Sequence, residues 1–246
     1  MPTRENEESK VIKQFARFAH QYDTYNVIQA EVARTLVHKL PIHKQSTILD
    51  LGCGSGEVYK NIKKRKIDFD RFIALDSSSE MLALHPTYTS IEKIIADFNN
   101  LETYNNLDIS MNETLLVSSS ALQWSVDLEF SFEQLSRKAN KAYFALFTAN
   151  TFKTLHKTAD IESPIYMPKV LKKAIEKYYD ASFELKEYRL EFKSVRDMFH
   201  YIKKSGVSGG EKQLSYRQIK ELMYQYPLEY LEFEVLFVEA TSLTSM

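Results

Sequence analysis

Residues 48–56 read ILDLGCGSG, an apolar run that leads directly into three glycines at alternate positions, Gly52, Gly54 and Gly56. The apolar run predicts a strand over 47–51, and the residues after the last glycine predict a helix over 57–66. Closely spaced glycines between a strand and a helix let the backbone approach a ligand without interference from Cβ atoms. The stretch therefore predicts a ligand-binding loop at the carboxyl end of a strand.

Strands and helices continue to alternate downstream of this loop. Ser77 and Glu80 predict a capping box at the start of the next helix, which places Asp76 at the end of the strand before it. Alternation of this kind is typical of an α/β fold with a doubly wound, mostly parallel sheet. The expected strands are 71–75, 92–96, 114–118 and 141–148, and the expected helices between them are 79–84 and 132–138.

The flanking segments complete a single domain over 1–246. Apolar residues at helical spacing predict two helices before Pro41, at 11–19 and 28–40. Downstream, we expect a strand over 183–192, helices that begin at Pro168 and Ser194, another opened by the Ser215 and Gln218 capping pair, and a last strand over 230–240. The divisions are 1–45 for the N-terminal helices, 46–148 for the cofactor-binding core, 149–225 for a lid insert that includes one core strand, and 226–246 for the final strand and tail.

Composition narrows the class of protein. The chain has 246 residues, of which 44% are hydrophobic and 26% charged, and its formal net charge is -1. A near-neutral protein has no general attraction for nucleic acid or an anionic membrane, so neither is expected as a partner. The single cysteine, Cys53, excludes an intrachain disulfide, and no apolar run reaches the roughly 18 residues of a membrane span. The polar start is unlike a secretory signal, so we expect a cytoplasmic protein.

The loop spacing and two acidic residues indicate which ligand the loop binds. The spacing is GxGxG, which differs from the GxGxxG dinucleotide fingerprint and lacks the GK[ST] ending of phosphate-binding loops. Asp76 ends the second predicted strand, where its carboxylate can accept hydrogen bonds from both hydroxyls of a ribose. Asp97 and Phe98 follow the third strand and offer an acceptor for an exocyclic amine beside an aromatic face. Together these residues predict an adenosine-binding site that lacks a phosphate-binding motif.

These features resemble the class I S-adenosylmethionine-dependent methyltransferases. The resemblance implies a Rossmann-like, seven-stranded sheet and S-adenosyl-L-methionine as cofactor, with Asp50 and Gly52 near its methionine part, Asp76 near the ribose and Asp97 near the adenine. Met81 packs against the adenine ring or is an ordinary core position, and both interpretations stay open. The implied cofactor-binding set is Asp50, Gly52, Cys53, Gly54, Gly56, Asp76, Ser77, Met81, Asp97, Phe98 and Ser118. No metal site is expected, because the histidines show no HExxH or similar spacing.

Four segments resemble one family more narrowly, the malonyl-acyl-carrier-protein O-methyltransferases of biotin synthesis. They are FARFAHQYDTYNVIQ at 15–29, SSSALQWSVDL at 118–128, FKSVRDMFHYIKKSGVSGG at 192–210 and YLEFEVLFV at 230–238. The resemblance implies methyl transfer to the free carboxylate of a malonyl thioester, with malonyl-acyl-carrier protein or malonyl-CoA as partner and a monomeric enzyme. A carboxylate is already ionised at neutral pH, so no general base is required.

Five residues are candidates for placing the substrate, and each has an ordinary structural alternative. They are Tyr22, Gln123, Trp124, Arg196 and His200. The two aromatic residues are as readily core positions, and the two lid residues share a helix face that is as readily solvated. Lys203 and Lys204 are the expected contacts for an acidic carrier protein.

Two other functions stay open. One is a methyltransferase for another small acid or a quinone-type ring, and the other is a non-catalytic protein that binds the cofactor as a scaffold. Nucleic-acid methylation is not expected, because no NPPY-type motif follows the fourth strand and the chain is not basic.

Overall fold

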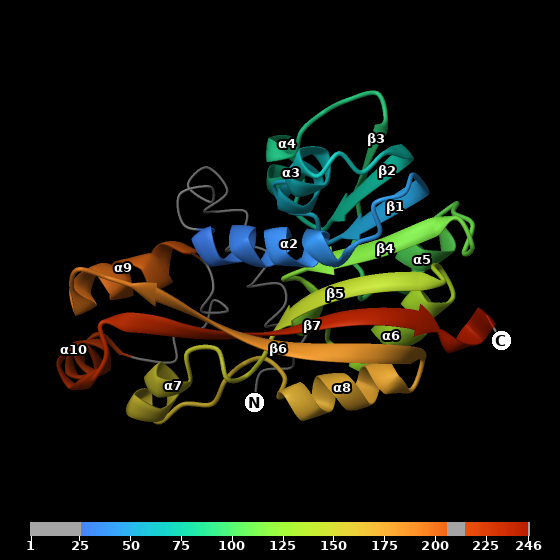
Figure 1. The fold of residues 1–246 in the computed structure, drawn as a ribbon. Coiled ribbons are helices and arrows are strands. Elements are labelled where there is room, and N and C mark those ends of the chain that lie inside the picture. Colours follow the sequence, from blue (N-terminus) through green and yellow to red (C-terminus); the bar gives the residue numbers. More distant parts are fainter. Residues whose placement is uncertain (1–25, 206–214, 246) are drawn as a thin grey trace.

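The computed structural model describes residues 26–205 and 215–245, and its centre is a seven-stranded sheet (Figure 1). The strand order within the described chain is β3-β2-β1-β4-β5-β7-β6. Every pairing from β3 through β5 is parallel, whereas β7 runs antiparallel to both of its neighbours. The strands are β1 (Gln45–Leu51), β2 (Phe69–Asp76), β3 (Ile91–Ile95), β4 (Thr114–Ser119), β5 (Lys141–Phe147), β6 (Tyr179–Glu191) and β7 (Tyr230–Ser242).

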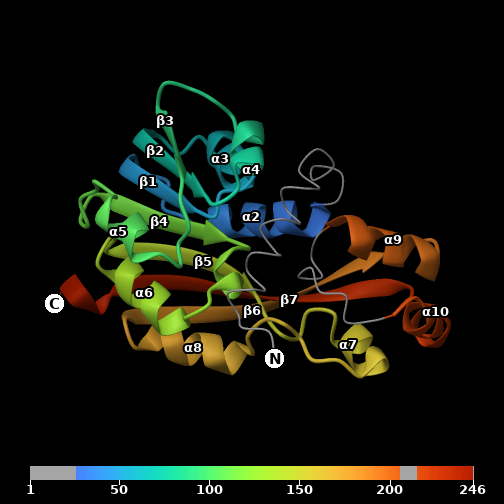
Figure 2. The same cartoon turned by 180° about the vertical axis from the view of Figure 1, so that it is seen from behind.

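Helices cover both faces of the sheet and enclose two hydrophobic clusters. On the face nearer the viewer in Figure 1 lie α2 (Val27–Lys39), α3 (Glu57–Lys64) and α4 (Ser79–Leu84). The opposite face, nearer the viewer in Figure 2, carries α5 (Leu101–Asn105), α6 (Leu128–Ser136) and α8 (Pro168–Glu176). This arrangement follows from the strand sequences, because successive apolar residues of a strand point to opposite faces and both faces need cover. Ile48 accordingly belongs to the first cluster and Leu49 to the second.

The long strands β6 and β7 extend past the parallel strands and carry the remaining helices. These are α7 (Lys153–Ala159), α9 (Val195–Ser205) and α10 (Tyr216–Gln225), and they gather at one end of the molecule (Figure 1). The short turns η1 (Leu122–Trp124) and η2 (Leu243–Ser245) follow β4 and β7. None of the helices in the described ranges is long and apolar enough to cross a membrane.

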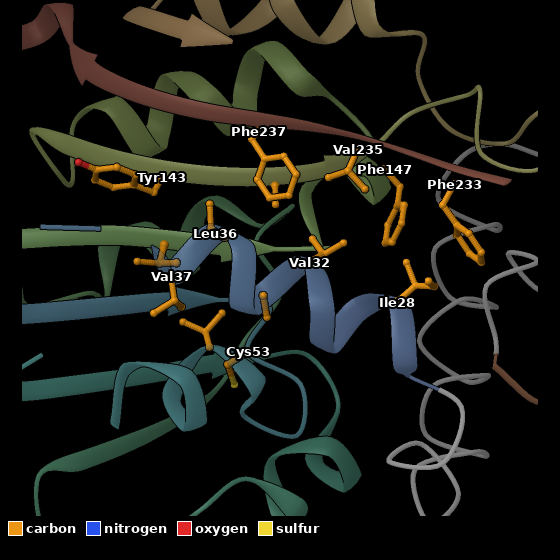
Figure 3. Packing of buried hydrophobic residues seen from close by; sticks show 14 of the residues in the cluster. Ile28, Val32, Leu36, Val37, Cys53, Tyr143, Phe147, Phe233, Val235 and Phe237 are labelled. Atoms are coloured by element: carbon orange, nitrogen blue, oxygen red, sulfur yellow. The ribbon is translucent and has the colours of Figure 1, made fainter. Parts of the chain in front are cut away.

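Helix α2 lies across the sheet with two different buried stripes. Ile28, Val32 and Leu36, which are four residues apart, face Phe147 and Phe237 of β5 and β7 (Figure 3). The neighbouring stripe begins with Gln29 and Ala33 and includes Val37, and all three of these residues are also buried. Two adjacent stripes at helical spacing make a wide buried surface, so contacts on both fix the rotation of the helix about its axis.

The predicted alternation of strands and helices is confirmed, with corrections at element ends. Helix α6 begins at Leu128, four residues before the predicted start, because the Asp127 side chain accepts a hydrogen bond from the backbone N–H of Phe130 at 3.0 Å and caps it there. Strand β6 begins at Tyr179 and not at 183. The predicted helix over 11–19 lies outside the described residues.

The predicted capping box at Ser77 and Glu80 is wrong by one residue. Ser78 is the N-cap of α4, and its hydroxyl accepts a hydrogen bond from the backbone N–H of Met81 at 3.2 Å. Both serines suit an N-cap chemically, and the backbone N–H of Ser78 donates to the Asp76 carboxylate at 2.9 Å. Asp76 still ends β2, as expected. The capping box at Ser215 and Gln218 is confirmed.

Candidate functional site

The glycine loop makes a turn that only residues without a side chain adopt easily. Gly52, Gly54 and Gly56 have φ values of 70°, 53° and 90°, in the left-handed region. The backbone N–H groups of Gly52 and Cys53 both donate to the carbonyl of Leu75 on β2, at 2.8 and 3.0 Å. A Cβ added to Gly52 would lie 2.2 Å from the Cβ of Ala121, which follows β4. The loop therefore packs directly against the segment after β4 and needs glycine to do so.

Asp76 joins this loop to the start of α4. One carboxylate oxygen accepts from the Gly54 N–H at 2.8 Å, and the other accepts from the Ser78 N–H at 2.9 Å. Burial raises the pKa of Asp76, and the hydrogen bonds from the backbone of Ser78, Gly54 and Ser77 act in the opposite direction. Each carboxylate oxygen has a second lone pair, so both can accept a further hydrogen bond from a ligand.

Asp50 is a fully buried acid one strand away. Its side chain is 0% exposed, and neither carboxylate oxygen has a hydrogen-bond partner within residues 26–205 and 215–245. Burial, and secondly the charge of Asp76, raise the pKa of Asp50 well above its usual range. The same burial, with the charges of both acids, raises the pKa of the Cys53 thiol, so Cys53 is a protonated, unreactive side chain. An unpartnered buried carboxyl favours a nearby cationic group.

Asp97 and Phe98 are held rigidly after β3. Asp97 accepts hydrogen bonds from the backbone and side-chain N–H groups of Asn99, at 2.8 and 3.1 Å. The hydroxyls of Thr103 and Tyr104 donate to the carbonyls of Asp97 and Phe98, both at 2.5 Å. The backbone of both residues and the Asp97 carboxylate therefore keep a defined position at the carboxyl edge of the sheet.

A single pocket collects most of the predicted cofactor residues at this edge. Among them, its lining includes Gly52, Cys53, Gly54, Asp76, Ser77, Met81, Asp97 and Phe98. Asp50, Gly56 and Ser118 do not line it. Ser118 is buried behind the pocket, where its hydroxyl donates to the Leu51 carbonyl at 2.8 Å. In doubly wound sheets, ligands bind outside the carboxyl ends of the strands, which is where this pocket lies.

The predicted substrate-placing residues are divided by the structure. Trp124 lines the pocket. Gln123 beside it is buried and donates to the Ser120 carbonyl at 2.7 Å, so it supports the loop after β4. Arg196 and His200 are exposed on α9 and do not line the pocket. Tyr22 and the side chains of Lys203 and Lys204 lie outside the described part of the chain, and their roles stay predictions.

Several pocket residues were not expected from the sequence. Gln29 and Ala33 come from α2, Ser119 is the last residue of β4, and Ser120 follows it. The sequence signal at Gln29 is one amide within the otherwise apolar surface of a predicted helix. Ser120 has a φ of 62°, which is uncommon for a residue with a side chain and occurs often at functional sites.

The ionisable side chains in the described lining of the pocket that carry charge at neutral pH are all acidic. Its described lining contains the carboxyl groups of Glu57, Asp76 and Asp97 and no arginine, lysine or histidine. Within the described residues, no group of three or more acidic, histidine or cysteine side chains is placed to hold a metal ion. The pocket is thus suited to an organic ligand that carries hydroxyls, an aromatic base and a positive charge.

Solved structures with the same architecture identify the fold. A protein of Bacillus halodurans described as a candidate methyltransferase aligns over 85% of this chain and 97% of its own, with 11% identity and a TM-score of 0.57. The chain has the Rossmann-like methyltransferase fold. A second methyltransferase, phosphoethanolamine N-methyltransferase 2 of Haemonchus contortus in complex with S-adenosyl-L-methionine, aligns over 84% of this chain and 51% of its own, with 13% identity and a TM-score of 0.52.

Curated relatives are similar in sequence, although no protein-family model matches the chain. A malonyl-[acyl-carrier protein] O-methyltransferase of Priestia megaterium is 27% identical over 150 residues, 58% of this chain and 53% of the relative. The protein of the same name from Acetivibrio thermocellus is 28% identical over 228 residues, 81% of this chain and 78% of the relative. The chain spans about half the length of the first curated relatives that it matches.

Proposed function

We propose that this protein is an S-adenosyl-L-methionine-dependent O-methyltransferase that methylates the free carboxylate of a malonyl thioester, carried by acyl-carrier protein or coenzyme A. The observation that carries the proposal is the pocket in which the glycine loop, Asp76, and Asp97 with Phe98 meet at the ends of three adjacent strands. The names of the curated relatives support the choice of acceptor.

The residues present fit this cofactor. The Asp76 carboxylate, already oriented by Gly54 and Ser78, accepts hydrogen bonds from the ribose hydroxyls. Asp97 and Phe98 hold the adenine. The carboxyl of Asp50 has no partner in the described residues, and the positive end of the ligand would favour its ionised form. When bound, the cofactor supplies an electrophilic methyl group on its sulfonium.

The protein's contribution to the reaction is placement and exclusion of water. A malonyl carboxylate is ionised at neutral pH, so no side chain has to remove a proton from it. Trp124 and Ala121 form an apolar part of the pocket wall beside the glycine loop, where they keep water from the reacting groups. Alignment of two reactants in this way can contribute roughly 7–11 kcal/mol to lowering a barrier.

Transfer of a labelled methyl group tests the proposal. Purified protein with methyl-labelled S-adenosyl-L-methionine should label malonyl-acyl-carrier protein or malonyl-CoA. The matched control is the same thioester with its carboxylate already esterified, which should take up no label. Asp76→Ala should weaken cofactor binding by about 1–3 kcal/mol, because it removes hydrogen bonds to a charged acceptor. Absence of label in both malonyl thioesters, with the cofactor bound, would contradict the proposed acceptor.

A second candidate is methyl transfer to another small acid or to a quinone-type ring. It is favoured by one observation, the lack of a cationic side chain among the described residues that line the pocket, since such a side chain would select a carboxylate. Free diacids, quinone-type acceptors and malonyl thioesters compared in one assay separate these two activities. Tight cofactor binding without transfer to any acceptor would instead indicate a scaffold protein.

A further inference from the structure

Gln29 is a buried amide whose oxygen has no partner within the described ranges. The residue is 7% exposed, it lines the pocket, and Oε1 accepts no hydrogen bond there. A buried polar atom without a partner costs free energy, and native proteins rarely keep one unless a ligand or water supplies the missing bond. A bound ligand with a hydrogen-bond donor at this position would supply the missing partner of the Gln29 oxygen.

The backbone of α2 keeps this amide in place. Ile28 is 5% and Val32 0% exposed, and both belong to the hydrophobic cluster between α2 and strands β5 and β7 (Figure 3). A rotation of the helix that withdrew Gln29 from the pocket would expose these side chains to water. Ala33, one turn further along, also lines the pocket and leaves room beside the amide.

The carboxyl end of β4 adds two hydroxyls that lack partners in the described part of the chain. Ser119 and Ser120 line the pocket, and the Oγ atoms of both are buried without a hydrogen bond. β4 lies on one side of β1 and its glycine loop, whereas β2 and β3, which lead to Asp76 and Asp97, lie on the other side. Helix α2, which carries Gln29, contacts β4, β5 and β7 and so lies on the same side as the two serines. Gln29, Ser119 and Ser120 therefore face the part of a bound ligand that lies away from its adenosine.

We propose that Gln29 is a positioning residue that binds the amino-acid end of S-adenosyl-L-methionine. Its Oε1 accepts a hydrogen bond from the α-ammonium group, and the hydroxyls of Ser119 and Ser120 donate to the α-carboxylate. A neutral amide and two hydroxyls suit this end of the ligand because it carries one positive and one negative charge. This inference rests on the proposed function and assigns a part of the cofactor to residues outside the glycine loop.

Truncated ligands distinguish this role from a structural one. Calorimetry should compare S-adenosyl-L-methionine with 5′-methylthioadenosine, which lacks the amino acid, on the wild type and on Gln29→Met, an apolar side chain of similar length. We expect Gln29→Met to weaken binding of the full cofactor by about 10- to 150-fold, as for loss of a hydrogen bond to a charged group, and to leave the truncated ligand within about twofold. The control Asp76→Asn should weaken both ligands by the same factor.

Three further measurements make the outcome decisive. Without ligand, Gln29→Met should unfold at the same temperature as the wild type or higher, because it removes an unpartnered amide. Gln29→Met should weaken binding of decarboxylated S-adenosylmethionine, which keeps the ammonium group, by the same factor as binding of the full cofactor. If Gln29→Met does not fold, Gln29→Ala should show the same selective loss. An equal effect on full and truncated ligands, or none, overturns this inference, whereas a wild type that binds neither ligand overturns the proposed function.

Discussion

Replacement of Gly52 by alanine should be far more damaging than the same replacement at Gly54. At Gly52 the new Cβ would lie 2.2 Å from the Cβ of Ala121, and the φ of 70° is strained for an alanine. The left-handed backbone costs roughly 1–2 kcal/mol, and the overlap with a short, inflexible side chain adds roughly 1–3 kcal/mol. At Gly54 the φ is 53°, but the nearest atom is the mobile Cε of Met81 at 3.3 Å, so little beyond the backbone cost applies.

Urea unfolding of both variants measures the difference directly. Gly52→Ala should lose about 2–5 kcal/mol and Gly54→Ala about 1–2 kcal/mol. The double variant Gly52→Ala with Ala121→Gly removes the overlapping atom, so it should recover the steric part and show a coupling of about 1–3 kcal/mol. Equal losses for the two single variants, or no coupling in the double variant, would refute the close approach of the glycine loop to the segment after β4.

Two further predictions concern stability without ligand. Burial and the charge of Asp76 raise the pKa of Asp50, so the folded protein keeps this proton to a higher pH than the unfolded chain, and stability falls as the pH rises between the two pKa values. Asp50→Asn removes that dependence. The melting temperature of this variant relative to the wild type should therefore rise from pH 5 to pH 8. A melting-temperature difference that does not change with pH would contradict the raised pKa of Asp50. Ser78→Ala should cost about 1 kcal/mol through loss of the cap on Met81, while Ser77→Ala should have a much smaller effect on denaturant unfolding.

Local chemistry made the glycine loop and Asp76 predictable from sequence. A strand, a glycine turn and a helix are specified by adjacent residues, and an acid at the end of the next strand then reaches the same edge of a parallel sheet. The cap of α4 was wrong by one position because Ser77 and Ser78 have the same side chain, and the hydrogen bond that the Ser78 hydroxyl accepts from Met81 becomes evident only in the folded structure.

Tertiary contacts decide the features that sequence did not predict. Arg196 and His200 share a face of α9, as expected, and the sequence left open whether that face meets the substrate or solvent. Burial of Met198 and Tyr201 turns the opposite face of α9 inward and leaves both residues exposed. Gln29 was missed because its importance depends on contact with a pocket whose other walls come from residues far along the chain. Helical periodicity locates a buried stripe but does not tell which neighbour covers it.

The place of β7 between β5 and β6 has a consequence for the growing chain on the ribosome. Phe237 of β7 packs against the helix that carries Gln29, yet more than 200 residues separate the two in the chain. A nascent chain that has emerged only as far as β6 lacks the strand that joins its sheet and completes the surface beneath α2. Ligand-binding competence should therefore arise late in translation, once Tyr230–Ser242 has left the exit tunnel, and not when the glycine loop first appears.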